Sequence, residues 1–263
     1  MRPLRPLSFA LAAALTFAGV APAVAQRQAA IIAAASDLKF AVEEIAAQYR
    51  RESGRELKLI FGSSGNFFQQ IRQSAPFDLF MSADEDYVFR LAELGLVGDK
   101  GALYAIGRVA IIAPHGSKLT VDARLEGLRA ALAEGRVARF AIANPDHAPY
   151  GRRAEEALKH AGLWEAIRPK LVFGENVSQA AQYATSGSAE GGIIAYSLAL
   201  SPQVSRLGTF ALIPENWHQP LRQRMVLLKG ASAPAREFYG YLQQAPARRV
   251  FKRYGFLLPG EDG

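Results

Sequence analysis

The sequence contains no cysteine and only four histidines among its 263 residues. Without thiols the chain forms no disulfide and offers neither a thiolate metal ligand nor a thiol nucleophile, a composition that suits an oxidising compartment. The histidines form no i, i+4 pair and no His-Glu-x-x-His motif, so the sequence predicts no transition-metal site. They are His115, His147, His160 and His218.

The chain also lacks an apolar run of the roughly 20 residues that a membrane-spanning helix needs. Its longest mainly apolar run, residues 7–20, follows Arg2 and Arg5 and precedes Ala23-Val24-Ala25. A basic start, a short apolar run and a small-x-small end are typical of a cleaved export signal. We therefore predict a signal peptide over residues 1–25, cleaved near Ala25, and a mature protein outside the cytoplasm.

Acidic residues are fewer than basic ones, with 24 Asp and Glu against 31 Lys and Arg and a formal net charge of +7. Such a chain can bind polyanions, but an exported protein rarely meets nucleic acid. Each basic pair lies on or beside a predicted helix with an apolar stripe, where solvated charge is expected. We therefore expect no nucleic-acid partner. The pairs are Arg50-Arg51, Arg152-Arg153, Arg248-Arg249 and Lys252-Arg253.

Strand-like apolar runs alternate with segments of helical period along the whole chain, which predicts an α/β fold with parallel strands. The first unit is a strand over 29–35 followed by a helix that begins near Leu38 and ends at Gly54. Further strands are predicted over 57–61, 77–81, 109–113, 138–143, 171–173, 192–196, 210–213 and 224–228, and further helices over 66–73, 84–94, 123–133, 151–161, 177–185, 233–243 and 247–254.

No linker rich in Pro, Gly or Ser divides the mature chain into consecutive domains, although it is long for one small α/β sheet. Two lobes that share crossover strands explain both facts. We predict one lobe from residues 26–105 plus 222–263 and the other from 106–221. In such sheets ligands bind beyond the carboxyl ends of the strands, so a cleft between the lobes is the expected site.

Serines follow two of the predicted strands at the point where a helix begins. Ser36 follows the first strand, and Ser63 and Ser64 lie between Gly62 and Gly65 after the second. Hydroxyls and free amides at helix starts can bind an anion together, although capping of the helix is the simpler interpretation. Neither turn contains Lys or Arg. A site with donors only disfavours a protonated oxyanion, and Asp37, beside Ser36, complicates this interpretation.

Seven segments, in order along residues 29–258, carry more specific motifs. They are Ala33-Ala34-Ala35-Ser36, Gly62-Ser63-Ser64-Gly65, Pro76-Phe77-Asp78-Leu79-Phe80-Met81-Ser82-Ala83-Asp84, Asn144-Pro145-Asp146-His147-Ala148-Pro149-Tyr150-Gly151, Glu175-Asn176-Val177, Gly192-Ile193-Ile194-Ala195-Tyr196 and Phe251-Lys252-Arg253-Tyr254-Gly255-Phe256. Together they resemble the periplasmic molybdate-binding proteins of ABC importers, over essentially the whole mature chain.

The resemblance implies a periplasmic binding protein fold of type II, with two lobes, mostly parallel sheets, crossover strands and an interlobe cleft. It implies that the oxyanion is bound by Ser36, Ser64, Tyr150, Val177 and Tyr196, with no direct metal ligand. Val177 would contribute its backbone amide and Tyr196 its hydroxyl. Tyr150 departs from the smaller residue frequent in the family, so its amide, its hydroxyl or only its ring would face the ligand. Asp37 and Arg224 are further departures.

By the same resemblance the protein is not an enzyme and needs no cofactor. It would capture molybdate or tungstate in the periplasm, as a monomer, and deliver it to permease subunits in the inner membrane that work with a separate ATPase.

Two alternatives remain open from the residues. Ser36-Asp37-Leu38-Lys39 matches the S-x-x-K motif of serine β-lactamases, but the S-D-N and K-T-G motifs are absent from the sequence. The second alternative is a receptor of the same fold for another oxyanion, such as sulfate or phosphate, or for a small organic solute.

Overall fold

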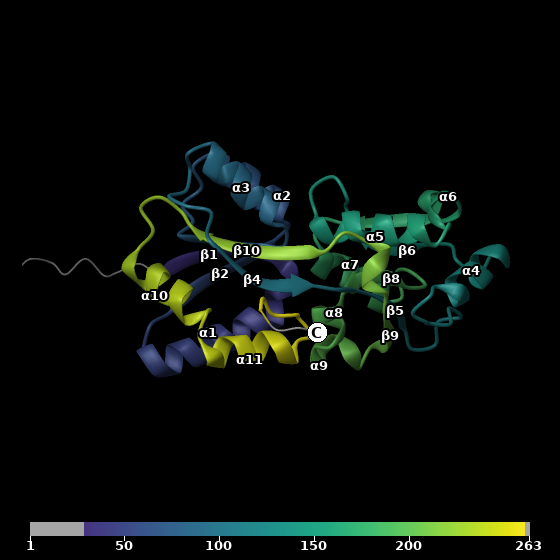
Figure 1. The fold of residues 1–263 in the computed structure, drawn as a ribbon. Coiled ribbons are helices and arrows are strands. Elements are labelled where there is room, and N and C mark those ends of the chain that lie inside the picture. The colour runs from purple at the N-terminus through teal and green to yellow at the C-terminus, as the bar shows by residue number, and fades with distance from the viewer. Residues whose placement is uncertain (1–28, 261–263) are drawn as a thin grey trace, which may run out of the picture.

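The computed structural model describes residues 29–260, so the predicted signal peptide lies outside the described residues. The strands form two five-stranded sheets, each with helices packed against it (Figure 1). In the described chain, no helix is long and apolar enough to cross a membrane.

The first sheet has the strand order β2-β1-β3-β10-β4 and the second the order β7-β6-β8-β5-β9. The strands are β1 (Ala30–Ala35), β2 (Leu57–Gly62), β3 (Leu79–Ser82), β4 (Ala102–Gly107), β5 (Val109–Pro114), β6 (Phe140–Ala143), β7 (Leu171–Gly174), β8 (Gly192–Ala195), β9 (Gly208–Leu212) and β10 (Leu221–Leu227).

Eight helices begin within three residues of their predicted starts, whereas the short helices α6, α8 and α9 were not predicted. They are α1 (Lys39–Ser53), α2 (Ser64–Arg72), α3 (Glu85–Glu93), α4 (Glu126–Ala133), α5 (Pro149–His160), α6 (Trp164–Ile167), α7 (Val177–Thr185), α8 (Tyr196–Ala199), α9 (Pro202–Ser205), α10 (Ala233–Tyr241) and α11 (Ala245–Arg253), with the short 3₁₀ turns η1 (Ser36–Leu38), η2 (Arg168–Lys170) and η3 (Glu215–Trp217).

The predicted α/β architecture is confirmed, and both sheets are mixed rather than wholly parallel. β1 is parallel to β2 and β3, and β6 is parallel to β7 and β8. β10 is antiparallel to β3 and β4, and β5 is antiparallel to β8 and β9. The antiparallel strands lie where the chain passes between the sheets: β5 leads away from the first sheet, and β10 returns to it.

The sequence does not predict β4, which is one of these crossing strands. It ends at Gly107 and β5 begins at Val109 in the other sheet. Only Arg108 separates the two strands, so the apolar pattern shows no break between them. Residues 213–220 form the second crossing, from β9 to β10.

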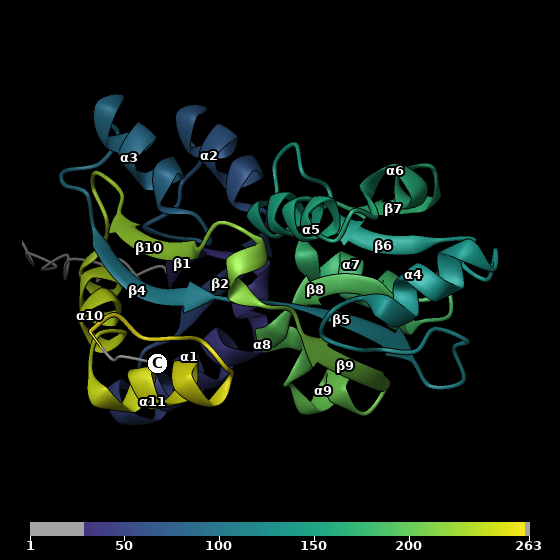
Figure 2. The same ribbon diagram turned by 45° about the vertical axis from the view of Figure 1, so that its right-hand side comes forward.

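The first sheet is buried on both faces, as expected of a sheet with helices on each side. Helices α2 and α3 cover one face, and α1, α10 and α11 cover the other (Figure 1 and Figure 2). Neighbouring residues alternate between the two layers. Ala33 and Phe80 pack in the cluster that contains the aromatic residues of α2, whereas Ile32 and Met81 pack with Ile45 of α1. This packing fixes the carboxyl ends of β1, β2 and β3 side by side.

Candidate functional site

A small cavity, with about 180 Å³ of empty space, lies where helices from both sides of the molecule begin. Residues of η1, α2 and the β3–α3 connection line it on the side of the first sheet, and the starts of α5 and α7 line it on the side of the second. The lining residues are Ala35, Ser36, Asp37, Gly62, Ser63, Ser64, Ala83, Ala148, Pro149, Tyr150 and Val177.

Ser64 is fully buried at the start of α2, after the turn that follows β2. Its Oγ accepts a hydrogen bond from the amide of Ala83 at 2.9 Å, which leaves the hydroxyl proton for another acceptor. The preceding Ser63 acts as the helix cap, because its Oγ accepts from the amide of Asn66 at 3.3 Å. Ser63 therefore caps α2, whereas the hydroxyl proton of Ser64 remains free to donate.

Ser36 follows β1 and does not cap its own helical turn. Its Oγ instead accepts from the amide of Ser178 in α7 at 3.3 Å, and Ser178 Oγ donates to the carbonyl of Ser36 at 2.8 Å. The hydroxyl proton of Ser36 is again free to donate into the cavity. Helix capping, the simpler interpretation from the sequence, does not apply to Ser36 or Ser64.

Backbone amides at the starts of α5 and α7 supply further donors. Asn176 caps α7 by accepting from the amides of Ser178 and Gln179, and the amide of Val177 has no acceptor within its helix. Tyr150 is the second residue of α5, so its amide likewise has none. Hydroxyls and amides therefore reach the cavity from both sheets.

The cavity contains donors but no cationic side chain. Of the described residues that line it, none is Lys, Arg or His. The partial positive charge of the helix starts and the free donors favour an anion there. The described chain also contains no cluster of three or more His, Cys, Asp or Glu that could hold a metal ion.

The hydroxyl of Tyr150 is already engaged and does not remain free for a ligand. It donates to Asp37 Oδ2 at 3.0 Å, and Gln223 Nε2 from β10 donates to the same oxygen at 2.6 Å. Tyr104 of β4 donates in turn to Gln223 Oε1 at 2.9 Å. Both crossing strands of the first sheet therefore contribute to the hydrogen bonds around Asp37, and the amide of Tyr150 is the donor left for an anion.

Burial raises the pKa of Asp37 to about 6, and the hydrogen bonds from Gln223 and Tyr150 offset only part of this shift. Asp37 is one of the residues that line the cavity, and its Oδ1 has no hydrogen-bond partner among the described residues.

The structure differs from the sequence-based expectation at Tyr196, which does not line the cavity. Its amide donates to the carbonyl of Arg108 at 2.9 Å, and its ring packs 4.9 Å from the guanidinium carbon of Arg108. The next residue, Ser197, contacts a residue that lines the cavity, because its Oγ donates to the backbone carbonyl of Asp37 at 2.8 Å.

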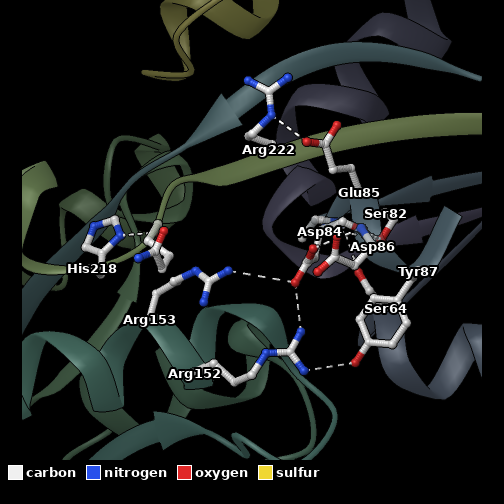
Figure 3. A network of polar contacts seen from close by, with 12 residues as sticks. Ser64, Ser82, Asp84, Glu85, Asp86, Tyr87, Arg152, Arg153, His218 and Arg222 are labelled. Carbon is white, nitrogen blue, oxygen red and sulfur yellow. Dashed lines mark hydrogen bonds and ion pairs between the residues drawn. The ribbon is translucent and has the colours of Figure 1, made fainter. Parts of the chain in front are cut away.

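Polar contacts join the two sides next to the cavity (Figure 3). Arg152 of α5 pairs with Asp84 at 2.9 Å and donates to the hydroxyl of Tyr87 at 3.2 Å. The amide of Gly65 donates to the carbonyl of His147 at 2.9 Å. The two sides are thus held closely against each other around the site.

Arg224, the other departure from the family pattern, lies on the crossing strand β10. Its guanidinium pairs with Glu85 at 2.8 Å, and Arg222 pairs with the same carboxylate at 2.5 Å. These pairs attach β10 to the start of α3 (Figure 3 shows the pair with Arg222).

Two sheets joined by crossing strands, with a buried cavity lined by hydroxyl and amide donors between them, are typical of two-lobed solute-binding proteins. The family model of bacterial extracellular solute-binding proteins matches residues 30–257. The chain belongs to this family. Because its relatives are solute-binding proteins, the prediction that it is not an enzyme is confirmed.

Individual relatives are similar over nearly the whole chain. The molybdate-binding protein ModA of Rhodobacter capsulatus is 33% identical, covering 86% of this chain and 87% of its own length. ModA of Azotobacter vinelandii is 32% identical, covering 92% and 94%. A solved structure of the Azotobacter vinelandii periplasmic molybdate-binding protein superimposes with a TM-score of 0.79 at 27% identity, covering 88% of this chain and 99% of that one. The predicted fold class is confirmed.

Asp37→Asn tests the cost of burying this carboxyl. Because the pKa of Asp37 is raised from 3.8 to about 6, the folded protein binds more protons than the unfolded chain in this range, and its stability falls as pH rises from about 4 to 6. The shift corresponds to about 2–3 kcal/mol. We expect Asp37→Asn to unfold at higher urea concentration than the wild type at pH 7.5, with the difference close to zero at pH 4.

The matched control is Asp146→Asn, which removes an exposed carboxylate from the loop before α5. Its stability should follow that of the wild type at both pH values. An Asp37→Asn variant no more stable than the wild type at pH 7.5 would contradict this explanation.

Proposed function

We propose that the protein captures molybdate, and tungstate in the same way, and delivers it to an ABC importer. The observation that carries this proposal is the cavity lined by hydroxyl and amide donors at converging helix starts, with no cationic side chain and with Asp37 as the one acidic residue. Such a site suits a compact, fully deprotonated dianion, whose oxygens accept hydrogen bonds only. The names of the relatives identify molybdate as the anion of this class.

The proposed donors are the hydroxyls of Ser36 and Ser64 and the amides of Tyr150 and Val177. They bond the oxygens of the oxyanion, so no protein atom bonds the metal and no cofactor takes part. Tyr196 is left out of this set, because it is not among the residues that line the cavity. Tungstate has the same charge and shape as molybdate, so the same donors would bind it.

The proposed location is the periplasm, with a signal peptide cleaved near Ala25, and the proposed state is a monomer. The partners would be permease subunits in the inner membrane. The sequence lacks the phosphate-binding motif G-x-x-x-x-G-K-[ST], so a separate subunit would supply the ATPase.

Residues 26–105 plus 222–263 would form one lobe and residues 106–221 the other. The crossings at Arg108 and at residues 213–220 support this division, because they connect the two sheets.

The second candidate is a receptor for another oxyanion, such as sulfate, or for a small organic solute. The cavity has room for only about one water molecule, which favours a compact inorganic anion over an organic solute. Calorimetric titration with molybdate, tungstate, sulfate and phosphate separates the oxyanions. We expect molybdate and tungstate to bind more tightly than sulfate and phosphate; tighter binding of sulfate would contradict the proposal.

Removing either serine hydroxyl should weaken binding, because each would make a charge-assisted hydrogen bond to a buried anion. We expect Ser36→Ala and Ser64→Ala each to weaken molybdate binding by about 1.5–3 kcal/mol, or roughly tenfold to somewhat over a hundredfold. Titration calorimetry measures the affinity, and circular dichroism confirms folding.

Ser63→Ala is the matched control for the second turn, because Ser63 caps α2 and its Oγ contacts His147 Nδ1 at 3.0 Å. It should weaken binding less than Ser64→Ala. Wild-type affinity in both the Ser36 and Ser64 variants would mean that the anion binds elsewhere.

Gly65→Ala tests the contact between the two sides. A Cβ at residue 65 would lie 2.5 Å from the carbonyl oxygen of His147, so the two sides could not approach as closely. We expect at least a tenfold loss of molybdate affinity, with little change in the stability of the ligand-free protein. Gly240→Ala in α10 is the control, because its Cβ would meet nothing within 4 Å. Equal affinity of the two variants would show that this contact is not needed for binding.

A further inference from the structure

Asp37 is the one acidic side chain in a cavity otherwise lined by donors and apolar groups. It is 1% exposed, and it lines the cavity. Its Oδ2 accepts from Tyr150 and Gln223, whereas its Oδ1 has no partner in the described part of the protein. A buried carboxylate oxygen without a donor is costly, so a role for Oδ1 is to be expected when the cavity is filled.

The groups packed around Asp37 do not neutralise its charge. Tyr150 faces it from α5, Gln223 from β10 and Ser197 from α8. Tyr104 of β4 donates a hydrogen bond to Gln223 and does not contact the carboxyl of Asp37 directly. Burial, followed by the nearby charge of Asp37, raises the pKa of both tyrosines well above the usual value, so they stay neutral. No ion pair of the described residues includes Asp37, and no cation lines the cavity.

An ionised Asp37 would therefore place a third negative charge beside a bound dianion. Protonation removes this repulsion and also converts Oδ1 into a donor that can bond an oxygen of the anion. Oδ2 meanwhile continues to accept from Tyr150 and Gln223. We propose that Asp37 takes up one proton when the anion binds, so that the protein binds a proton and a fully deprotonated dianion together. This inference rests on the proposed function.

Because Asp37 is buried, the free energy needed to protonate its carboxyl near neutral pH is small. Burial raises its pKa to about 6, so the proton is available close to neutral pH. The carboxyl of Asp37 also distinguishes ligands that carry a proton from ligands that do not. A ligand that carries its own proton, such as hydrogen phosphate, would donate to the ionised carboxylate and bind without proton uptake.

Calorimetric titration of the wild type measures the proton directly. Heats of molybdate binding, determined at pH 8 in two buffers with different ionisation enthalpies, give the number of protons taken up. We expect about one proton per molybdate. We also expect affinity to be nearly constant below pH 6 and to fall about tenfold per pH unit between pH 7 and 8.5, since the proton must then be taken from a more alkaline solution.

Asp37→Asn places a permanent donor where the protonated oxygen would lie, and its carbonyl can still accept from Tyr150 and Gln223. We expect this variant to bind molybdate without proton uptake, with affinity independent of pH, and more tightly than the wild type at pH 8. Asp146→Asn removes an exposed carboxylate beside α5 and should keep both the proton uptake and the pH dependence.

The outcomes separate this inference from the proposed function. Molybdate binding by the wild type with no proton uptake and no pH dependence would overturn the inference and leave the function intact, whether or not the Asp37 variant folds. Binding of phosphate but not molybdate, without proton uptake, would overturn both, because the ligand would then supply the proton.

Discussion

The first amides of a helix have no acceptor within the helix, and a helix that begins inside a protein must find one elsewhere. In this chain α2, α5 and α7, together with the turn η1 that leads into α1, begin around one buried cavity. Capping residues serve some of these amides, as Asn176 does in α7. The remaining amides and the hydroxyls of Ser36 and Ser64 are donors without an acceptor. The oxygens of an oxyanion can accept hydrogen bonds from them.

The rest of the structure positions these helix starts. Parallel pairing of β1 with β2 and β3 brings the first two turns together, and burial of the sheet on both faces keeps them rigid. The crossing strands hold the second set of helix starts opposite the first. They also place Gln223 next to the buried Asp37 and Tyr104 next to Gln223. One group of hydrogen bonds therefore links the crossing strands to the site.

Much of this could be predicted from the sequence, because strand and helix periods and capping residues are local signals. The predicted helix over 177–185 matches α7 as observed, since Asn176 marks its start. β4 was not predictable from the apolar pattern, because Arg108 alone separates it from β5. Tyr196 shows the limit of transferring a residue by motif: it directly follows β8, and it is not among the residues that line the cavity.

The partners of Asp37 could not be predicted, because Tyr150 and Gln223 lie 113 and 186 residues away along the chain and meet it only in the folded protein. Ser178 illustrates the same point, since nothing in its local sequence indicates the bond to Ser36. Sequence patterns identify which residues end a strand or start a helix, but the choice between free and engaged donors depends on tertiary contacts.

The central claim is that an oxyanion occupies the cavity between these helix starts. Anomalous diffraction at the molybdenum absorption edge, from crystals grown with molybdate, tests it most directly. The account predicts one strong anomalous peak within the cavity, with oxygens in hydrogen-bonding distance of Ser36 Oγ, Ser64 Oγ and the amide of Val177. A peak only at another place on the protein, with the cavity empty, would contradict it.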